Sequence, residues 1–176
     1  QFTQETGFQA RVVSVGTGQA LRNAQNGDGD VLLVHAKNAE EEFVAQGWGL
    51  ARHDVMYNDF IIAGPPSDPA GILGGSDAVA ALVKIAKNKA LFVSRGDDSG
   101  TPRAELRLWR ATDIDLISAS GAWYRETGSG MGATLNMATS IGAYVMTDRA
   151  TWLSFANRGN LEVLVEGDAR LFNQYG

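Results

Sequence analysis

Apolar strand-like runs and amphipathic helical segments alternate along this chain of 176 residues. The runs that predict strands are residues 9–15, 30–35, 55–63, 90–93, 144–146 and 161–165. The segments that predict helices are residues 19–24, 38–46, 76–89, 102–109, 130–142 and 149–155. Chains that alternate in this way build α/β folds, in which right-handed crossovers join neighbouring strands. The alternation therefore predicts an α/β fold with mainly parallel sheets.

Composition limits the classes of function. A hydrophobic content of 44% is enough for a core, in one domain or in two small lobes. A net charge of −5 and a pI of about 5.0 argue against a nucleic-acid-binding surface. The chain has no cysteine, which excludes disulfides, thiolate metal ligands and a cysteine nucleophile. No apolar stretch approaches the length of a membrane span.

The loop at residues 94–101 has the pattern of an anion site. It follows the apolar run 90–93 and precedes a helix with Pro102 in its first turn. A strand–loop–helix junction points unpaired backbone N–H groups and the positive end of the helix dipole at one place. The sequence therefore predicts that an anion binds at this loop.

The side chains of this loop support two interpretations. In the first, Arg95 contributes a cation to the site, while Asp97 and Asp98 orient Arg95, since carboxylates placed against a dianion would repel it. In the second, the charges neutralise one another in a purely structural loop, and Asp98 or Ser99 caps the following helix. Both remain open from the pattern alone.

Two further glycine-rich turns precede helices, at residues 16–18 and 128–132. Such turns gather at the carboxyl ends of the strands in α/β sheets, so they can join the loop at 94–101 around one ligand. Their candidate donors are Thr17, Ser129, Gly130 and Met131. The set offers donors and no evident base, which suits a fully ionised tetrahedral oxyanion; hydrogen phosphate would also need an acceptor.

Motifs for other chemistry are weak or absent. The turn at 16–18 lacks the third glycine of a dinucleotide fingerprint, and residues 128–133 match G-x-G-x-x-A after a polar segment rather than a clear strand. No P-loop and no G-x-S-x-G motif occurs. His35 and His53 are isolated, without a metal-ligand spacing. These observations favour a binding protein over an enzyme and predict no metal site.

Several segments resemble one known family, the substrate-binding proteins of bacterial tungstate ABC transporters, which are two-lobed periplasmic binding proteins of type II. The matching segments span nearly the whole chain and are residues 15–21, 30–36, 55–60, 94–101, 128–137, 147–149 and 165–168. The resemblance implies capture of tungstate, with molybdate as a close competitor, and delivery to an ABC permease. It implies no cofactor, no catalytic residue, a periplasmic or other extracytoplasmic location, and a monomeric state for the full-length protein.

The resemblance also implies the ligand contacts. Thr17, Arg95, Ser99 and Thr101 carry over by matching motif. Ser129, Gly130 and Met131 are added from the expected position of their turn. The oxyanion would lie in a cleft between the two lobes.

Three of the four prolines lie at residues 65–69 and mark a hinge. We expect lobe 1 to comprise residues 1–63 and 167–176, lobe 2 residues 64–166, and the hinges to lie near 60–66 and 165–169. Family members begin with a strand and a Thr-Thr-Ser turn and continue beyond the last residue here, so the resemblance implies a processed or truncated product that lacks the N-terminal strand and a C-terminal segment. Two alternatives stay open: a sulfate- or phosphate-type binder, and an enzyme acting on a phosphorylated or nucleotide substrate.

Overall fold

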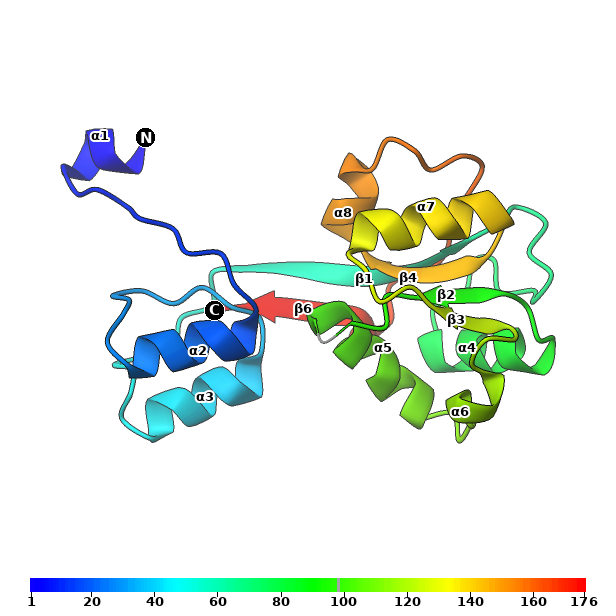
Figure 1. Cartoon of the computed structure of the whole chain (residues 1–176), viewed down its shortest axis with the longest axis horizontal. Coiled ribbons are helices and arrows are strands. Elements are labelled where there is room, and N and C mark those ends of the chain that lie inside the picture. The colour runs from blue at the N-terminus through cyan, green and yellow to red at the C-terminus, as the bar shows by residue number, and fades with distance from the viewer. Residues whose placement is uncertain (98) are drawn as a thin grey trace. The chain divides into compact units, whose positions relative to one another are not determined.

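The computed structural model describes residues 1–97 and 99–176 (Figure 1). Contacts divide the chain into two compact units. Unit 1 comprises Gln1–His53 with Gly176, and unit 2 comprises Asp54–Tyr175. The units are described separately. The lobe boundaries expected from the sequence stay a prediction.

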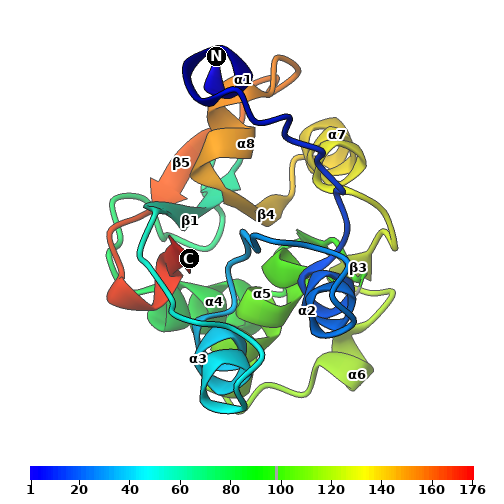
Figure 2. The same cartoon turned by 90° about the vertical axis from the view of Figure 1, so that its left-hand side faces the viewer.

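Unit 1 contains the helices α1 (Phe2–Thr6), α2 (Thr17–Gln25) and α3 (Lys37–Ala45), and Figure 2 views α2 and α3 close to end-on. The helices expected near 19–24 and 38–46 are therefore confirmed. The strands expected at 9–15 and 30–35 are wrong, because the described residues there form no strand.

The apolar runs of unit 1 remain extended but without a sheet. Val12 is 89% exposed and Val31 is 90% exposed, whereas Val34 is buried. Val34 exchanges backbone hydrogen bonds with Gly176, at N–O distances of 3.0 and 3.1 Å. A strand needs a partner along its whole edge. Among the described residues, the pair of Val34 and Gly176 is too short to provide such an edge. The apolar runs therefore do not form strands, although their pattern is typical of strands.

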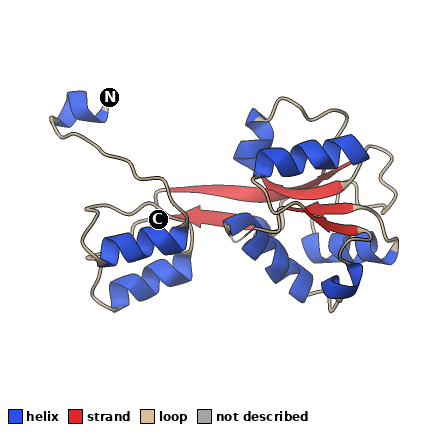
Figure 3. Ribbon diagram, in the orientation of Figure 1, coloured by secondary structure: helices blue, strands red, loops and turns tan. Residues whose placement is uncertain are grey.

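Unit 2 is built on a six-stranded sheet (Figure 3). The strands are β1 (Met56–Gly64), β2 (Phe92–Ser94), β3 (Tyr124–Glu126), β4 (Tyr144–Asp148), β5 (Glu162–Val165) and β6 (Phe172–Tyr175). Their order is β3-β2-β4-β1-β5, and β6 pairs with the first half of β1.

The sheet is mixed, so the expectation of mainly parallel sheets is wrong. β2 runs parallel to β3 and β4, whereas β1 runs antiparallel to β4, β5 and β6. Alternation of strands and helices does not reveal whether a helix crosses over to a parallel strand or returns to an antiparallel one. The helix between β1 and β2 returns the chain in the opposite direction.

Helices cover both faces of this sheet (Figure 1). On one face lie α4 (Ala78–Lys87), α5 (Gly100–Arg110) and α6 (Leu116–Ala119); on the other lie α7 (Met131–Ile141) and α8 (Arg149–Ser154). A one-turn 3₁₀ helix, η1 (Ala169–Leu171), precedes β6. Successive side chains of β1 point to opposite faces of the sheet, as in any strand. Phe60 and Ile62 lie in the core under α4 and α5, and Ile61 and Ala63 lie in the core under α7.

Local signals placed α4, α5, α7 and α8 close to their expected bounds. Asp148 caps α8 by accepting a hydrogen bond from the Thr151 N–H at 2.8 Å. Met131, Leu135 and Ala138 are buried on one face of α7, as their spacing predicts. No helix among the described residues has the length and apolar character needed to cross a membrane.

Candidate oxyanion site

Two loops of unit 2 lie together at the carboxyl edge of the parallel strands β2 and β3. Ser94 and Glu126, the last residues of these strands, are in register. The Thr127 N–H donates to the Ser94 carbonyl at 3.0 Å, and the Thr127 hydroxyl donates to the Arg95 carbonyl at 3.1 Å. The loop that enters α5 is therefore fixed to the loop that leads to α7.

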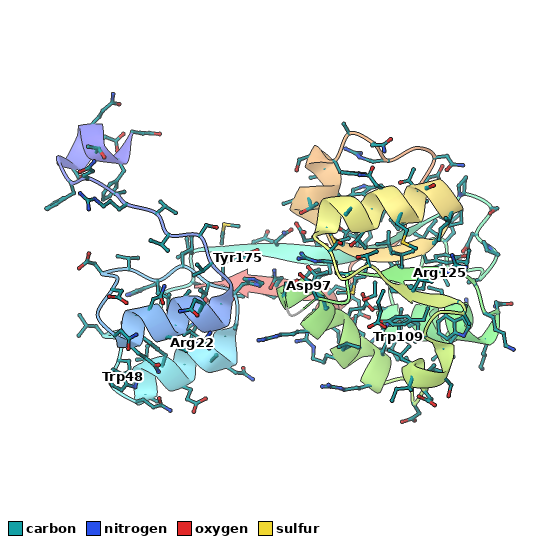
Figure 4. All side chains as sticks on the ribbon, in the orientation of Figure 1. Arg22, Trp48, Asp97, Trp109, Arg125 and Tyr175 are labelled. Atoms are coloured by element: carbon teal, nitrogen blue, oxygen red, sulfur yellow. The ribbon has the colours of Figure 1, made fainter. Side chains whose placement is uncertain are left out.

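Asp97 organises the first loop and is labelled in Figure 4. The Arg95 guanidinium donates to one carboxylate oxygen of Asp97 at 2.5 Å, and the Ser99 hydroxyl donates to the other at 2.9 Å. Burial tends to raise the pKa of Asp97, but the hydrogen bonds from Arg95 and Ser99 outweigh it and lower the pKa. Asp97 therefore stays ionised and holds both neighbours in place.

The Arg95 side chain is only 19% exposed, and its buried Nε has no hydrogen-bond partner among the described residues. Such a group is costly to leave unpaired. Arg95 thus keeps donor capacity beyond its ion pair with Asp97.

Gly96 allows the close approach of this loop to β3. Its φ is +65°, in the left-handed region, and a Cβ built on it would lie 2.7 Å from the Cβ of Glu126. Only glycine fits both conditions without movement of the strand. The tight packing sets where Arg95 emerges from β2.

The start of α5 presents backbone donors. Ser99 is the N-cap residue, yet its side chain makes no capping hydrogen bond, because its hydroxyl donates to Asp97. The N–H groups of Gly100 and Thr101 belong to the first turn and have no partner within the helix. Thr101 is buried. This end of α5 therefore has the electrostatic character that favours an anion.

The second loop is held by threonine hydroxyls. Those of Thr127 and Thr134 are 2.9 Å apart, and the Thr134 hydroxyl donates to the Gly130 carbonyl at 3.1 Å. The Ser129 N–H donates to the Thr127 hydroxyl at 3.3 Å, and the Ser129 hydroxyl donates to the Thr127 carbonyl at 3.2 Å. Gly130 is the N-cap of α7 and has no side chain to cap it. Met131 has a buried side chain, so it can offer a ligand only its backbone N–H.

The structure thus brings the expected residues of unit 2 into two adjoining loops. They are Arg95, Asp97, Ser99, Thr101, Ser129, Gly130 and Met131. Thr17 belongs to unit 1, where it opens α2, and its place at the site stays a prediction. Asp98 lies outside the described residues, so its expected role stays a prediction as well.

Thr127 and Thr134 were missed from the sequence. Thr127 directly follows the short strand β3, and Thr134 lies four residues after Gly130 on the buried side of α7. That spacing places the Thr134 hydroxyl against the first turn of its own helix, which is the only local signal. Nothing local indicates the contact of Thr127 with Arg95.

Donors dominate the described part of the site. Its one carboxylate, Asp97, is engaged by Arg95 and Ser99. Across the described residues, no group of three or more histidine, cysteine or acidic side chains is placed to hold a metal ion. The Arg95 guanidinium and the starts of α5 and α7 suit an anion without its own proton, whereas the hydroxyls of Ser99 and Ser129 donate within the loops.

A mixed sheet with helices on both faces defines an α/β fold, and the two loops lie at the carboxyl edge of its parallel strands. A family model described as PBP superfamily domain matches residues 1–176. The chain belongs to this family, and its fold is that of the type II periplasmic-binding-like proteins.

Three relatives are similar over nearly the whole of this chain. The tungstate-binding protein TupA of Peptoclostridium acidaminophilum is 52% identical over 100% of this chain and 61% of its own length. A putative ABC transporter anion-binding protein of Haloferax volcanii is 49% identical over 98% of this chain and 52% of its own length. The solved structure of TupA from Desulfovibrio alaskensis has 50% identity and a TM-score of 0.87, covering 99% of this chain and 70% of that one. The chain therefore spans 52% to 61% of the length of these two curated relatives.

Proposed function

We propose that this chain is the oxyanion-binding part of an extracytoplasmic substrate-binding protein, which captures tungstate and delivers it to an ABC permease. Molybdate would be the close competitor. The observation that carries the proposal is the junction of the two loops, in which Thr127 fixes the Arg95 loop to the Ser129 loop. The names of the relatives, which include tungstate-binding and ABC transporter anion-binding proteins, agree with it.

The ligand contacts proposed in unit 2 are the donors of the two loops, with Asp97 orienting Arg95. Thr17 would add a hydroxyl from the other lobe, so that the anion binds in a cleft and favours a closed form. The lobes would be divided as the sequence predicts, near residues 63 and 167.

Catalysis is not part of the proposal. An enzyme that used these loops on a phosphorylated substrate would need a general base beside Arg95. Asp97 does not suit that role, because its pKa is lowered and both of its oxygens accept hydrogen bonds from Arg95 and Ser99. The anion would be bound and released unchanged, with no cofactor.

A calorimetric titration of the purified protein with tungstate, molybdate, sulfate and phosphate tests the proposal. Tungstate and molybdate should bind more tightly than sulfate or phosphate, because their longer metal–oxygen bonds fill a roomier donor cage. A thermal-shift panel that adds nucleotides is the companion measurement, since a ligand at a hundredfold excess over its Kd stabilises by about 2.7 kcal/mol. Preference for sulfate or phosphate, or turnover of a nucleotide, would contradict the proposal.

A further inference from the structure

Glu105 is a buried acid directly beneath the candidate site. It lies on α5, one turn after Thr101, and is 1% exposed. One of its carboxyl oxygens accepts hydrogen bonds from the Tyr124 hydroxyl at 2.8 Å and from the Trp109 indole N–H at 3.2 Å. Trp109 is labelled in Figure 4 on α5. Glu105 forms no ion pair among the described residues, so a charge on it would be uncompensated.

Ser94 connects Glu105 to both loops. The Ser94 hydroxyl forms a hydrogen bond with the Glu105 carboxyl, which lowers the pKa of Glu105. The same hydroxyl accepts a hydrogen bond from the Gly96 N–H at 3.3 Å. The Ser94 carbonyl accepts the Thr127 N–H at 3.0 Å. A change in the proton state of Glu105 therefore reaches the residue from which the Arg95 loop starts and on which the second loop is anchored.

The surroundings of Glu105 favour its neutral form. Burial raises the pKa of Glu105 to about 7, although hydrogen bonds from Tyr124, Ser94 and Trp109 act against the rise. The charge of Glu126 on β3 raises it further. The other titratable neighbour, Tyr124, has its own pKa raised well above the ordinary value by burial and by Glu105, so it stays neutral.

Among the described residues, α4 and β4 bring no buried charged side chain into the core that they share with α5. α4 and β4 pack against α5, and their residues in the shared core are apolar or aromatic. They include Leu82, Ile85, Tyr144 and Met146. The Tyr144 hydroxyl donates to Asp68 rather than to Glu105.

We propose that Glu105 couples oxyanion binding to pH: it takes up a proton when a dianion binds above it, so affinity falls as the solution becomes alkaline. This inference rests on the proposed function and concerns the same site. A dianion held by Arg95 and the start of α5 disfavours a second negative charge one helical turn below. A protonated Glu105 carries no such charge.

The sign of the effect follows from linkage. Below about pH 7 Glu105 is protonated with or without the anion, so affinity does not change with pH. Above that value the free protein loses the proton and the bound protein retains it, so binding requires proton uptake. Once both forms are ionised, affinity is lower by a constant factor. A shift of one pKa unit on binding corresponds to about a tenfold loss.

The test is the tungstate Kd from pH 6 to pH 9 by calorimetry, for the unmodified protein and for Glu105→Gln. Tungstate remains a dianion over this window. The unmodified protein should lose about tenfold in affinity. Glu105→Gln keeps a neutral oxygen that accepts from Tyr124 and Trp109, and its affinity should not change with pH. Binding enthalpies in buffers of different ionisation enthalpy should show proton uptake above pH 7 only in the unmodified protein.

Two further variants separate Glu105 from its neighbours. Glu126→Gln removes a nearby exposed carboxylate and should preserve the fall in affinity, at a slightly lower pH. Tyr124→Phe removes a donor that favours the ionised form, so the fall should begin at a higher pH. If circular dichroism shows that Glu105→Gln does not fold, two other measurements test the inference. They are proton uptake on binding by the unmodified protein and the higher pH at which affinity begins to fall in Tyr124→Phe.

The outcomes distinguish the inference from the proposed function. Tungstate affinity that is independent of pH, or that falls equally in Glu105→Gln, overturns the coupling and leaves the oxyanion site intact. Absence of tungstate binding at every pH overturns the proposed function, and the coupling with it.

Discussion

The hydroxyl of Thr127 donates a hydrogen bond of 3.1 Å to the carbonyl oxygen of Arg95, across 32 positions of sequence. This bond joins the loop after β2 to the loop after β3. Since the same hydroxyl accepts the Ser129 N–H, one side chain positions donors on both loops. The relative placement of the two halves of the site in unit 2 therefore depends on Thr127.

Replacing Thr127 with valine should loosen this junction. The shape is retained, but the Arg95 carbonyl and the Ser129 N–H each lose a partner, which costs about 1–2 kcal/mol of unfolding free energy. Tungstate affinity should fall as well, because the two sets of donors are no longer held together. Urea denaturation and calorimetric titration measure the two effects. Thr127→Ser is the control: it keeps the hydroxyl and should retain both the stability and the tungstate affinity of the unmodified protein. A valine variant with unchanged affinity would contradict the role given to this hydrogen bond.

Arg95→Ala should weaken tungstate binding by about 10- to 100-fold, the loss expected when one charged hydrogen-bonding partner of an anion is removed. The fold should persist, because Arg95 lies in a loop and, among the described residues, its ion pair is with Asp97 in the same loop. Arg110→Ala is the matched control: it removes an exposed arginine from the last turn of α5, away from the site. Equal affinities for the two variants, measured by titration, would remove Arg95 from the site.

Gly96→Ala should destabilise unit 2 by about 1–2 kcal/mol, because a residue with φ of +65° is strained and its Cβ would meet the Cβ of Glu126. Gly132→Ala is the control. Gly132 lies within α7, with open space around its Cβ position, and alanine there should stabilise by about 0.5–1 kcal/mol. Thermal unfolding measures the change in stability of each variant, which should be negative for Gly96→Ala and positive for Gly132→Ala. Destabilisation of similar size in both would show that backbone conformation is not the cause.

The local parts of the site could be predicted from the sequence, because they depend on adjacent residues. The run at 90–93, the polar loop and Pro102 indicate a strand, a junction and a helix start without any knowledge of the fold. The pairing of Arg95 with Asp97 is also local, since a single residue, Gly96, separates them in the chain. Local chemistry thus identified the loop, and the structure describes how Asp97 orients it.

The non-local parts could not be predicted. β3 has three residues, Tyr124–Glu126, which are too few and too polar to show a strand pattern. Without β3, the contact of Thr127 with Arg95 has no visible cause. The burial of Glu105 could not be predicted either, because a glutamate in a helix normally faces solvent. Its burial results from Trp109 and Tyr124, which pack around it only in the folded protein.

The antiparallel direction of β1 could not be predicted, for a similar reason. Its apolar pattern shows that residues 60–64 are buried on both faces, which parallel strands share with the centre of a mixed sheet. Only the pairing with β4 and β5 distinguishes the two cases. The runs at 9–15 and 30–35 in unit 1 make the complementary point, since a strand pattern without a partner does not become a strand.

Asp168 supports a final prediction, on stability against pH. Its carboxylate accepts the Ala78 N–H at the start of α4 at 2.7 Å and the Arg170 N–H at 2.8 Å. The Arg170 side chain above all, against some burial, lowers the pKa of Asp168 from 3.8 to about 2. Because the folded pKa lies below the unfolded one, the stabilisation is present above pH 3.8 and is lost as the pH falls through about 2.

Asp168→Asn should therefore cost about 1–2 kcal/mol at pH 7, through a weakened cap and a lost charge. The difference from the unmodified protein should shrink between pH 4 and pH 2, as measured by urea denaturation at each pH. Asp115→Asn, at the cap of the short exposed helix α6, is the control and should have little effect on global stability, because α6 is a single turn. If the ionised carboxylate is the source of the deficit, protonation of Asp168 in the unmodified protein must remove the difference. A deficit in Asp168→Asn that stays constant down to pH 2 would therefore contradict this role.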